Sequence, residues 1–129
     1  MAVHTSTKLA HVAAGRLTAA EVEAGAVIAS GRTGKCIVVT DVTLRAIGGA
    51  AATADSVDLQ DSTTGTRVLV ALVAALTQDA IVKPDTTDVT STNLGVKLGI
   101  GEGLKLVAAG AGVLDGCTHV DYIVSYVRG

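Results

Sequence analysis

The sequence predicts an all-β protein, an antiparallel β-sandwich or jelly roll, and three observations predict it. The 129 residues are 49% hydrophobic but only 2% aromatic, with no Trp and no Phe. The apolar content is therefore aliphatic, and the abundant Val and Thr favour extended strands. Hydrophobic residues alternate with polar ones in several segments, which is the period of a half-buried strand. Turn residues divide the chain into roughly eight to ten short strands.

The N-terminal part of the chain has two interpretations that the sequence leaves open. Residues 1–23 are predicted to be an arm that lies on a partner surface or a first edge strand, because residues 1–14 mix polar and apolar types without a strong core pattern. Residues 24–129 are predicted to form a single jelly-roll domain. A short helix is expected at residues 17–24, with Thr18 as the N-cap and Glu21 at the capping-box position.

Residues 26–29 and 36–46 are predicted to be the next two strands. In the longer one the even-numbered residues are mostly apolar and are expected to face the core, which would make Cys36 a buried structural thiol. Between the strands, residues 31–34 resemble a phosphate-binding loop, but a true one has four residues between its glycines, followed by Lys and Ser or Thr. We therefore favour a hairpin turn.

Three further strands are predicted in the middle of the chain. In residues 56–61, Val57 and Leu59 are expected to point inward. Residues 67–76 and 104–109 are apolar on both faces, so strands there need a second cover, which in a small antiparallel protein is commonly another subunit. A helix is the alternative for residues 67–76, although the Thr, Gly, Gln and Asp residues that flank them favour a strand.

The last strand is predicted at the C-terminus, where one face carries apolar and tyrosine side chains and the other is polar. The inward set is Val120, Tyr122, Val124 and Tyr126. The glycine-rich residues 99–103 and 110–112 before this strand are expected to be turns, because neither has the glycine spacing of a dinucleotide-binding loop.

Charge and hydropathy argue against several classes of protein. The net charge is −2, from 10 basic and 12 acidic residues with no Lys/Arg cluster, and the aromatic platforms of single-strand binders are missing, so no nucleic-acid partner is expected. The longest apolar run, residues 68–76, is far shorter than the roughly 18 residues needed to span a bilayer. We therefore expect no membrane association and find no signal-peptide pattern.

Catalytic motifs are not found, so the expectation is a protein that is not an enzyme, with no cofactor and no small-molecule substrate. The one compact cluster is Cys117-Thr118-His119 beside Asp115 and Asp121, which would suit a metal ion or a nucleophile. No second Cys/His pair lies nearby in the sequence. We therefore favour the interpretation of a strand entry followed by a surface histidine, with no bound metal.

Four segments carry a resemblance to a known family. These are the Gly-Lys-Cys-Ile-Val-Val-Thr stretch at residues 34–40 with its continuation to residue 44, residues 56–59, the Gly-Glu-Gly-Leu turn within residues 99–106, and the closing Tyr-containing strand at residues 120–127. Over residues 24–129 the chain resembles tailed-bacteriophage capsid decoration (cement) proteins with a tumour-necrosis-factor-like jelly-roll fold.

This resemblance implies a homotrimer located on the capsid surface of the virion, with the major capsid protein as its partner. The alternatives are a tail or head–tail joining component and a ligand- or receptor-binding jelly-roll module. The side chains that we expect to bury surface between subunits are Leu69, Val73, Val107, Tyr122 and Tyr126. Because both tyrosines share one face of the last strand, that strand is the first place to look for a trimer axis.

Overall fold

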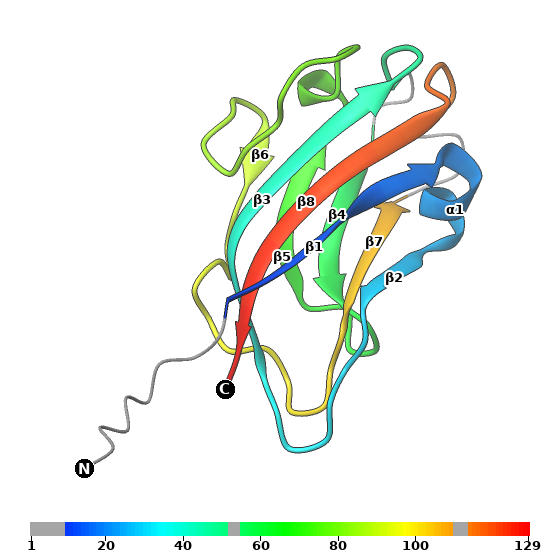
Figure 1. Cartoon of the computed structure of the whole chain (residues 1–129). Coiled ribbons are helices and arrows are strands. Elements are labelled where there is room, and N and C mark those ends of the chain that lie inside the picture. Colours follow the sequence, from blue (N-terminus) through cyan, green and yellow to red (C-terminus); the bar gives the residue numbers. More distant parts are fainter. Residues whose placement is uncertain (1–9, 52–54, 110–113) are drawn as a thin grey trace.

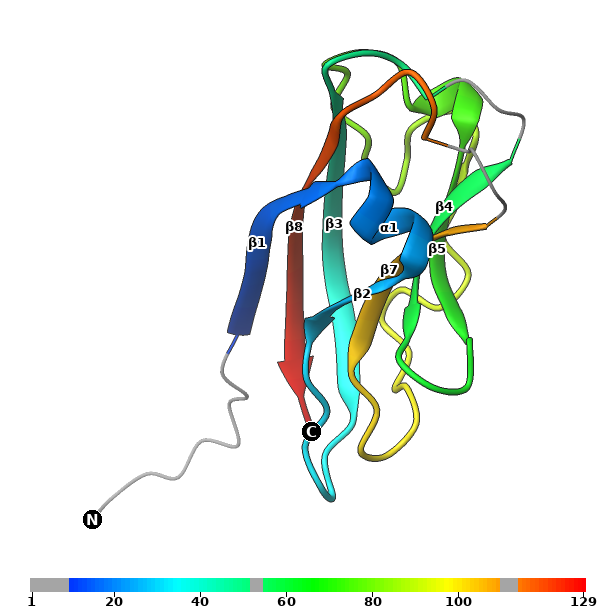
Figure 2. The same ribbon diagram turned by 90° about the vertical axis from the view of Figure 1, so that its right-hand side faces the viewer.

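The computed structural model describes residues 10–51, 55–109 and 114–129, which form two antiparallel sheets packed face to face (Figures 1 and 2). The three-stranded sheet has the order β1 (Ala10–Thr18), β8 (His119–Arg128), β3 (Ile37–Ile47). The five-stranded sheet has the order β2 (Ala26–Ala29), β7 (Leu104–Ala109), β4 (Ser56–Asp61), β5 (Arg67–Leu72), β6 (Val89–Thr90). A helix, α1 (Ala19–Ala24), and a 3-10 turn, η1 (Val73–Ala75), complete the elements. The all-β prediction is confirmed.

The strands pair in a nested order along the chain. The first strand, β1, pairs with the last, β8; β2 pairs with β7; and β4 pairs with β5. The outer edge of β3 is bridged by the segment 78–97 through Val38–Lys97, Leu44–Val82 and Ala46–Gln78. Wrapping the chain in nested pairs that alternate between two sheets is the connectivity of a jelly roll.

The space between the sheets is filled by aliphatic side chains. Val42 and Val124 from one sheet and Leu59 and Leu106 from the other are all 0% exposed. Val22 of α1, also 0% exposed, closes the side at which α1 joins the sheets (Figure 2). Much of the aliphatic excess of the sequence therefore belongs to the core of the single chain.

Helix α1 begins at a capping box. The Thr18 hydroxyl accepts the Glu21 N–H at 3.2 Å, and the Glu21 carboxylate accepts the Thr18 N–H at 3.0 Å. The Thr18 N–H and the Thr18 hydroxyl both donate to the Glu21 carboxylate, at 3.0 Å each, and these two bonds lower the pKa of Glu21. The predicted cap is confirmed, but the helix begins two residues later than predicted because β1 continues to Thr18.

An extra residue in β3 corrects the predicted alternation of that strand. The register with β8 shifts between Val39 and Asp41, so that Thr40 is left without a paired residue in the ladder with β8. Beyond this shift the even-numbered residues are buried as predicted, but before it the odd-numbered Ile37 and Val39 are the ones at 0% exposure. Cys36 is consequently half-buried at the strand entry and not on the inward face.

The segment 67–76 is part strand and part helical turn. β5 ends at Leu72, and Val73–Ala75 form η1, so the strand interpretation holds for the first six residues and the helical alternative for the Ala-rich end. A register shift between Leu59 and Gln60 also leaves Val68 as an extra residue in β5.

The turn at residues 31–34 joins the two sheets. Its closing hydrogen bond runs from the Lys35 N–H to the Arg32 carbonyl at 3.1 Å, and β2 and β3 on either side lie in different sheets. The predicted turn is present, but it is a crossover between sheets and not a hairpin.

Replacing Gly31 by Ala is expected to destabilise the protein by about 1–3 kcal/mol, the usual range for overpacking. A Cβ at residue 31 would lie 1.9 Å from the Gly101 carbonyl oxygen, so the backbone of one turn would have to move. Urea unfolding measures the loss. Gly99→Ala is the control, because its Cβ would meet only a side-chain atom, the Glu102 Cγ at 3.0 Å, and no backbone. Equal unfolding midpoints for the two variants would contradict this account of the contact.

Candidate functional site: the outer face of the five-stranded sheet

The outer face of the five-stranded sheet carries an apolar surface around one carboxylate. Since Val57 and Leu59 of β4 point into the core, Asp58 points away from it, and its cross-strand partners are Val107 of β7 and Val70 of β5. One row along, Ser56 lies between Ala109 and Leu72. We call the surface formed by Asp58, Val70, Leu72, Val73 and Val107 the outer patch.

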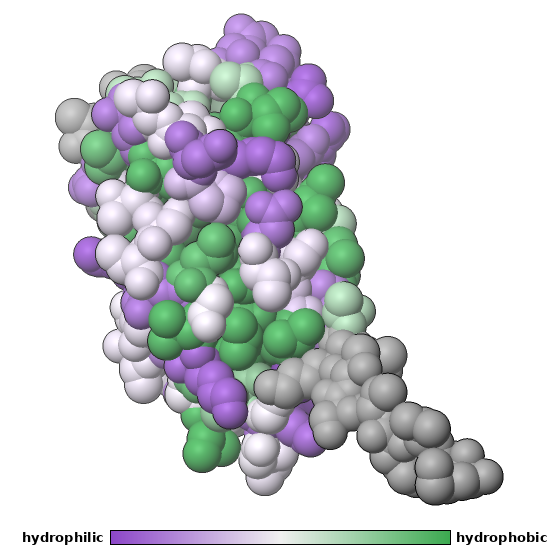
Figure 3. Space-filling model, turned by 90° about the vertical axis from the view of Figure 1, so that its left-hand side faces the viewer, coloured by the Kyte–Doolittle hydropathy of each residue, from purple (hydrophilic) through white to green (hydrophobic). Residues whose placement is uncertain are grey.

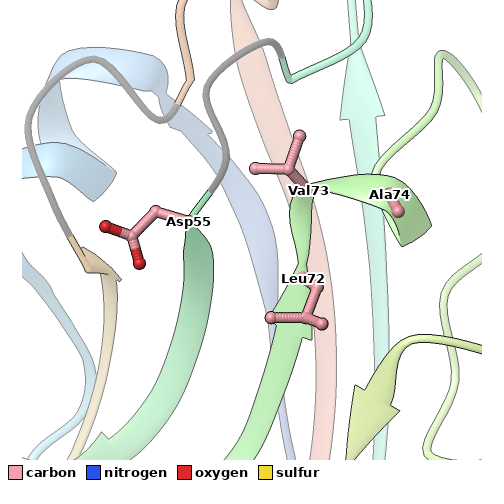
Figure 4. Close-up of a pocket in the computed structure, with 4 residues that line it drawn as sticks. All are labelled: Asp55, Leu72, Val73 and Ala74. Carbon is pink, nitrogen blue, oxygen red and sulfur yellow. The ribbon is translucent and has the colours of Figure 1, made fainter.

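A hollow lies at one end of the outer patch. It is an open pocket of about 490 Å³ lined by Asp55, Leu72, Val73 and Ala74 (Figure 4). Asp55 precedes β4, and the other three residues lie where β5 passes into η1. The Val73 N–H donates to the Asp55 carbonyl at 3.0 Å, which ties the two walls together. Leu72 is 45% exposed, so the pocket offers apolar surface to a partner side chain.

The carboxylate at the centre of the outer patch is already desolvated. Asp58 is 1% exposed although it points away from the core, and its oxygens accept the Ser56 hydroxyl at 2.7 Å and pair with Arg67 Nε at 3.1 Å. A buried carboxylate is tolerated only when it is paired and hydrogen-bonded. A molecule that covers the outer patch therefore does not have to remove water from this carboxylate.

The structure separates the five residues that the sequence singles out. Leu69 and Tyr126 are 1% and 8% exposed and lie within the core of the chain. Tyr122 is half-buried, with its hydroxyl 3.0 Å from the position of a Cβ on Gly15 of β1. Val73 and Val107 lie in the outer patch. Their role between subunits stays a prediction.

Sequence reasoning missed the other members of the outer patch, Leu72, Val70 and Asp58, and the Arg67 side chain that pairs with Asp58. These residues come together through the pairing of β4 with β5, which depends on the register shift at Gln60. Alternation alone places Leu69 and Val73 on one face. The structure separates them, because β5 ends at Leu72. The available signal was Asp58 between two inward-facing residues, with Arg67 at the start of the next strand.

The outer face of the three-stranded sheet has a different character. The Arg16 guanidinium donates two hydrogen bonds, of 2.6 and 3.0 Å, to the Asp121 carboxylate. This pairing raises the pKa of Arg16 and lowers that of Asp121. Exposed apolar side chains stand among such ion pairs: Val12, Ile81 and Ile123. The view onto the side of β3 and β6 likewise shows green apolar and purple polar residues interleaved (Figure 3). Ion pairs of this exposed kind contribute little to stability.

Cys117 and Thr118 directly precede β8, and His119 is the first residue of that strand. Cys117 is 8% exposed, its thiol lies 3.3 Å from the Leu114 carbonyl, and burial raises its pKa, which keeps it a poorly nucleophilic thiol. His119 Nδ1 lies 3.0 Å from the Thr118 hydroxyl. Among the described residues no group of three His, Cys, Asp or Glu side chains is placed to hold a metal ion. No helix in the ranges that the structure describes is long and apolar enough to cross a membrane.

The chain resembles a known protein in fold but matches none in sequence. No protein-family model matches the chain, and a search of curated proteins found no match. Among solved structures, a chain of the cyanophage Pam1 capsid asymmetric unit has a similar fold, with a TM-score of 0.55 and 16% sequence identity. The superposition covers 98% of this chain and 90% of that chain. The two chains therefore share a fold over nearly their whole lengths.

Proposed function

We propose that this chain is a structural virion protein, a homotrimeric decoration (cement) protein that binds the outer surface of a phage shell built from a major capsid protein. The observation that carries the proposal is the fold shared over 98% of this chain with a chain of a phage capsid asymmetric unit. The nested strand pairing agrees with the tumour-necrosis-factor-like jelly roll of the family that the sequence resembles. Because a fold alone does not define a function, the surface must also supply contacts.

The outer patch supplies such contacts. Its valines and Leu72 offer apolar area, the pocket beside Val73 accepts a partner side chain, and the Asp58–Arg67 pair gives one charged group whose buried half is already satisfied. This is a binding role and not a catalytic one.

The outer patch, which has five residues, suits binding through several copies of the chain at once. Each protomer buries a modest area, and three linked copies raise the effective concentration of the second and third contacts on a symmetric lattice. In this proposal Val73, Val107 and Tyr122 contact other chains. Leu69 and Tyr126 act from the core, where they hold β5 and β8 in place.

Light scattering and co-sedimentation test the proposal together. The expected mass is three times the 12.8 kDa of one chain, and expanded shells made without the protein should bind it saturably. A stable monomer that does not sediment with the shells would contradict the proposal.

Replacing Leu72 by Asp should weaken shell binding at least tenfold, because about 1 kcal/mol of apolar burial is lost from the exposed part of the side chain and a charge enters the interface. Leu72 is 45% exposed in the free chain, so the variant should fold. Ile100→Asp, at an apolar residue 74% exposed in a distant turn, is the matched control and should bind like the wild type. Equal shell affinity of both variants would exclude the outer patch as the contact surface.

A further inference from the structure

The free edge of β1 is the only long, unguarded strand edge within the described ranges. β1 has nine residues and pairs with β8 without interruption from Ala10 to Thr18 (Figure 1). The outer edge of β3 is bridged by the segment 78–97, β2 has four residues and a register shift, and β6 has two residues. Proteins normally guard such an edge with Lys, Pro, a bulge or a covering segment, because its unpaired N–H and C=O groups invite another strand.

β1 has none of these guards. It contains no Lys and no Pro, its register has no shift, and in the described part of the chain β8 is the only strand with which it pairs. Its middle residues, Ala13, Ala14 and Gly15, are small and uncharged. Its one full charge, on Arg16, is already paired with Asp121 of the same chain. An approaching strand therefore meets only small side chains at the middle of β1, and the charge of Arg16 is already paired.

We propose that this edge pairs with the β1 edge of a second copy of the chain, across a two-fold axis, so that two three-stranded sheets join into one of six strands. A second copy fits because β1 is the only edge in the described part of the chain with enough length to pair. The contact must therefore use the same edge on both copies, which is an isologous contact.

The residues that face one another in this arrangement are complementary. With the axis at Ala14, antiparallel pairing places Val12 opposite Arg16 of the second copy and Ala13 opposite Gly15 of the second copy. No two like charges are opposed. Val12, 64% exposed in the free chain, covers the aliphatic stem of the facing arginine.

This contact goes beyond the proposed decoration function and does not depend on it. A two-fold contact cannot close a trimer, so it doubles whatever unit exists, whether a single chain or a trimer. Between units that stand side by side on a lattice, high local concentration would favour it.

A charge exchange at residue 14 tests the pairing. Ala14→Lys places two like charges opposite each other at the axis, and the dissociation constant of the doubled species should rise by up to about fivefold. Light scattering over a concentration series should then show wild-type mass approaching twice that of A14K. An equimolar mixture of A14K and A14E should recover the doubled mass, because opposite charges now face each other.

Two further variants keep the test decisive. Val12→Lys, also on the exposed face of β1, should weaken doubling as A14K does, and circular dichroism shows whether each variant is folded. Ile100→Lys, 74% exposed and far from β1 in sequence, should double like the wild type. The proposal is overturned if wild type and A14K have the same mass at every concentration. It is equally overturned if mixing A14K with A14E does not restore the doubled species.

Discussion

Replacing Arg67 by Met lowers the free energy of unfolding by about 1–3 kcal/mol, because the buried Asp58 carboxylate loses its charged partner while Arg67 itself is 59% exposed and screened by solvent. Asp58 is 1% exposed, and in the variant only the Ser56 hydroxyl would still donate a hydrogen bond to its carboxylate. Met retains the length of the Arg67 stem, so packing over the outer patch changes little. Urea unfolding monitored by circular dichroism gives the difference.

Arg45→Met is the matched control for this variant. Arg45 lies 3.5 Å from Asp79, and both side chains are about half exposed, so the loss should be within about 1 kcal/mol, as for surface pairs generally. If R67M were no less stable than R45M, the centre of the outer patch would not depend on the ion pair.

Replacing Asp61 by Ala should also lower the free energy of unfolding by about 3 kcal/mol, because several hydrogen bonds to a charged group are lost together. Asp61 is 1% exposed and organises the turn between β4 and β5. One carboxylate oxygen accepts the Gly65 and Thr66 N–H groups at 2.6 and 3.1 Å, and the other accepts the Thr64 hydroxyl.

Asp61→Asn distinguishes the hydrogen bonds from the mere presence of a side chain. Its amide oxygen can still accept the two backbone N–H groups, but the amide nitrogen cannot accept the Thr64 hydroxyl. About half of the loss should therefore return in equilibrium urea unfolding. A D61A variant as stable as the wild type would show that the turn forms without this carboxylate.

Where local pattern and burial agree, the sequence predicts the elements closely. Residues 104–109 are β7 to the residue, because Leu104 and Leu106 alternate with a lysine and a valine between glycine-rich stretches of the sequence. The capping box at Thr18 and Glu21 is likewise readable, since both partners lie within one turn of chain.

Register is the part of the fold that the pattern could not supply. A single extra residue, Thr40, reverses which residues of β3 face the core, and Val68 does the same in β5. Such shifts arise from pairing with a distant strand, and a period-2 pattern contains no information about the partner. For this reason the predicted buried position of Cys36 is wrong, and its side chain is only half-buried.

The candidate site depends on the same long-range information. From its place between Val57 and Leu59, Asp58 is expected to be solvated. Pairing with β5 instead brings Arg67 to its carboxylate and sets it between the valines of the neighbouring strands. Apolar character on both faces of residues 67–76 predicts a second cover for this segment, and that cover stays a prediction. Sequence could not say that Leu69 would be buried within the chain while Leu72 is left exposed.

Electron cryomicroscopy of shells reconstituted with the purified protein is the most direct test of the proposed capsid role. The account predicts added density in three-fold clusters on the outer surface of the shell, with the outer patch around Leu72 turned toward a neighbouring chain. Shells that show no added density at saturating protein, or density anywhere but the outer surface, would contradict it.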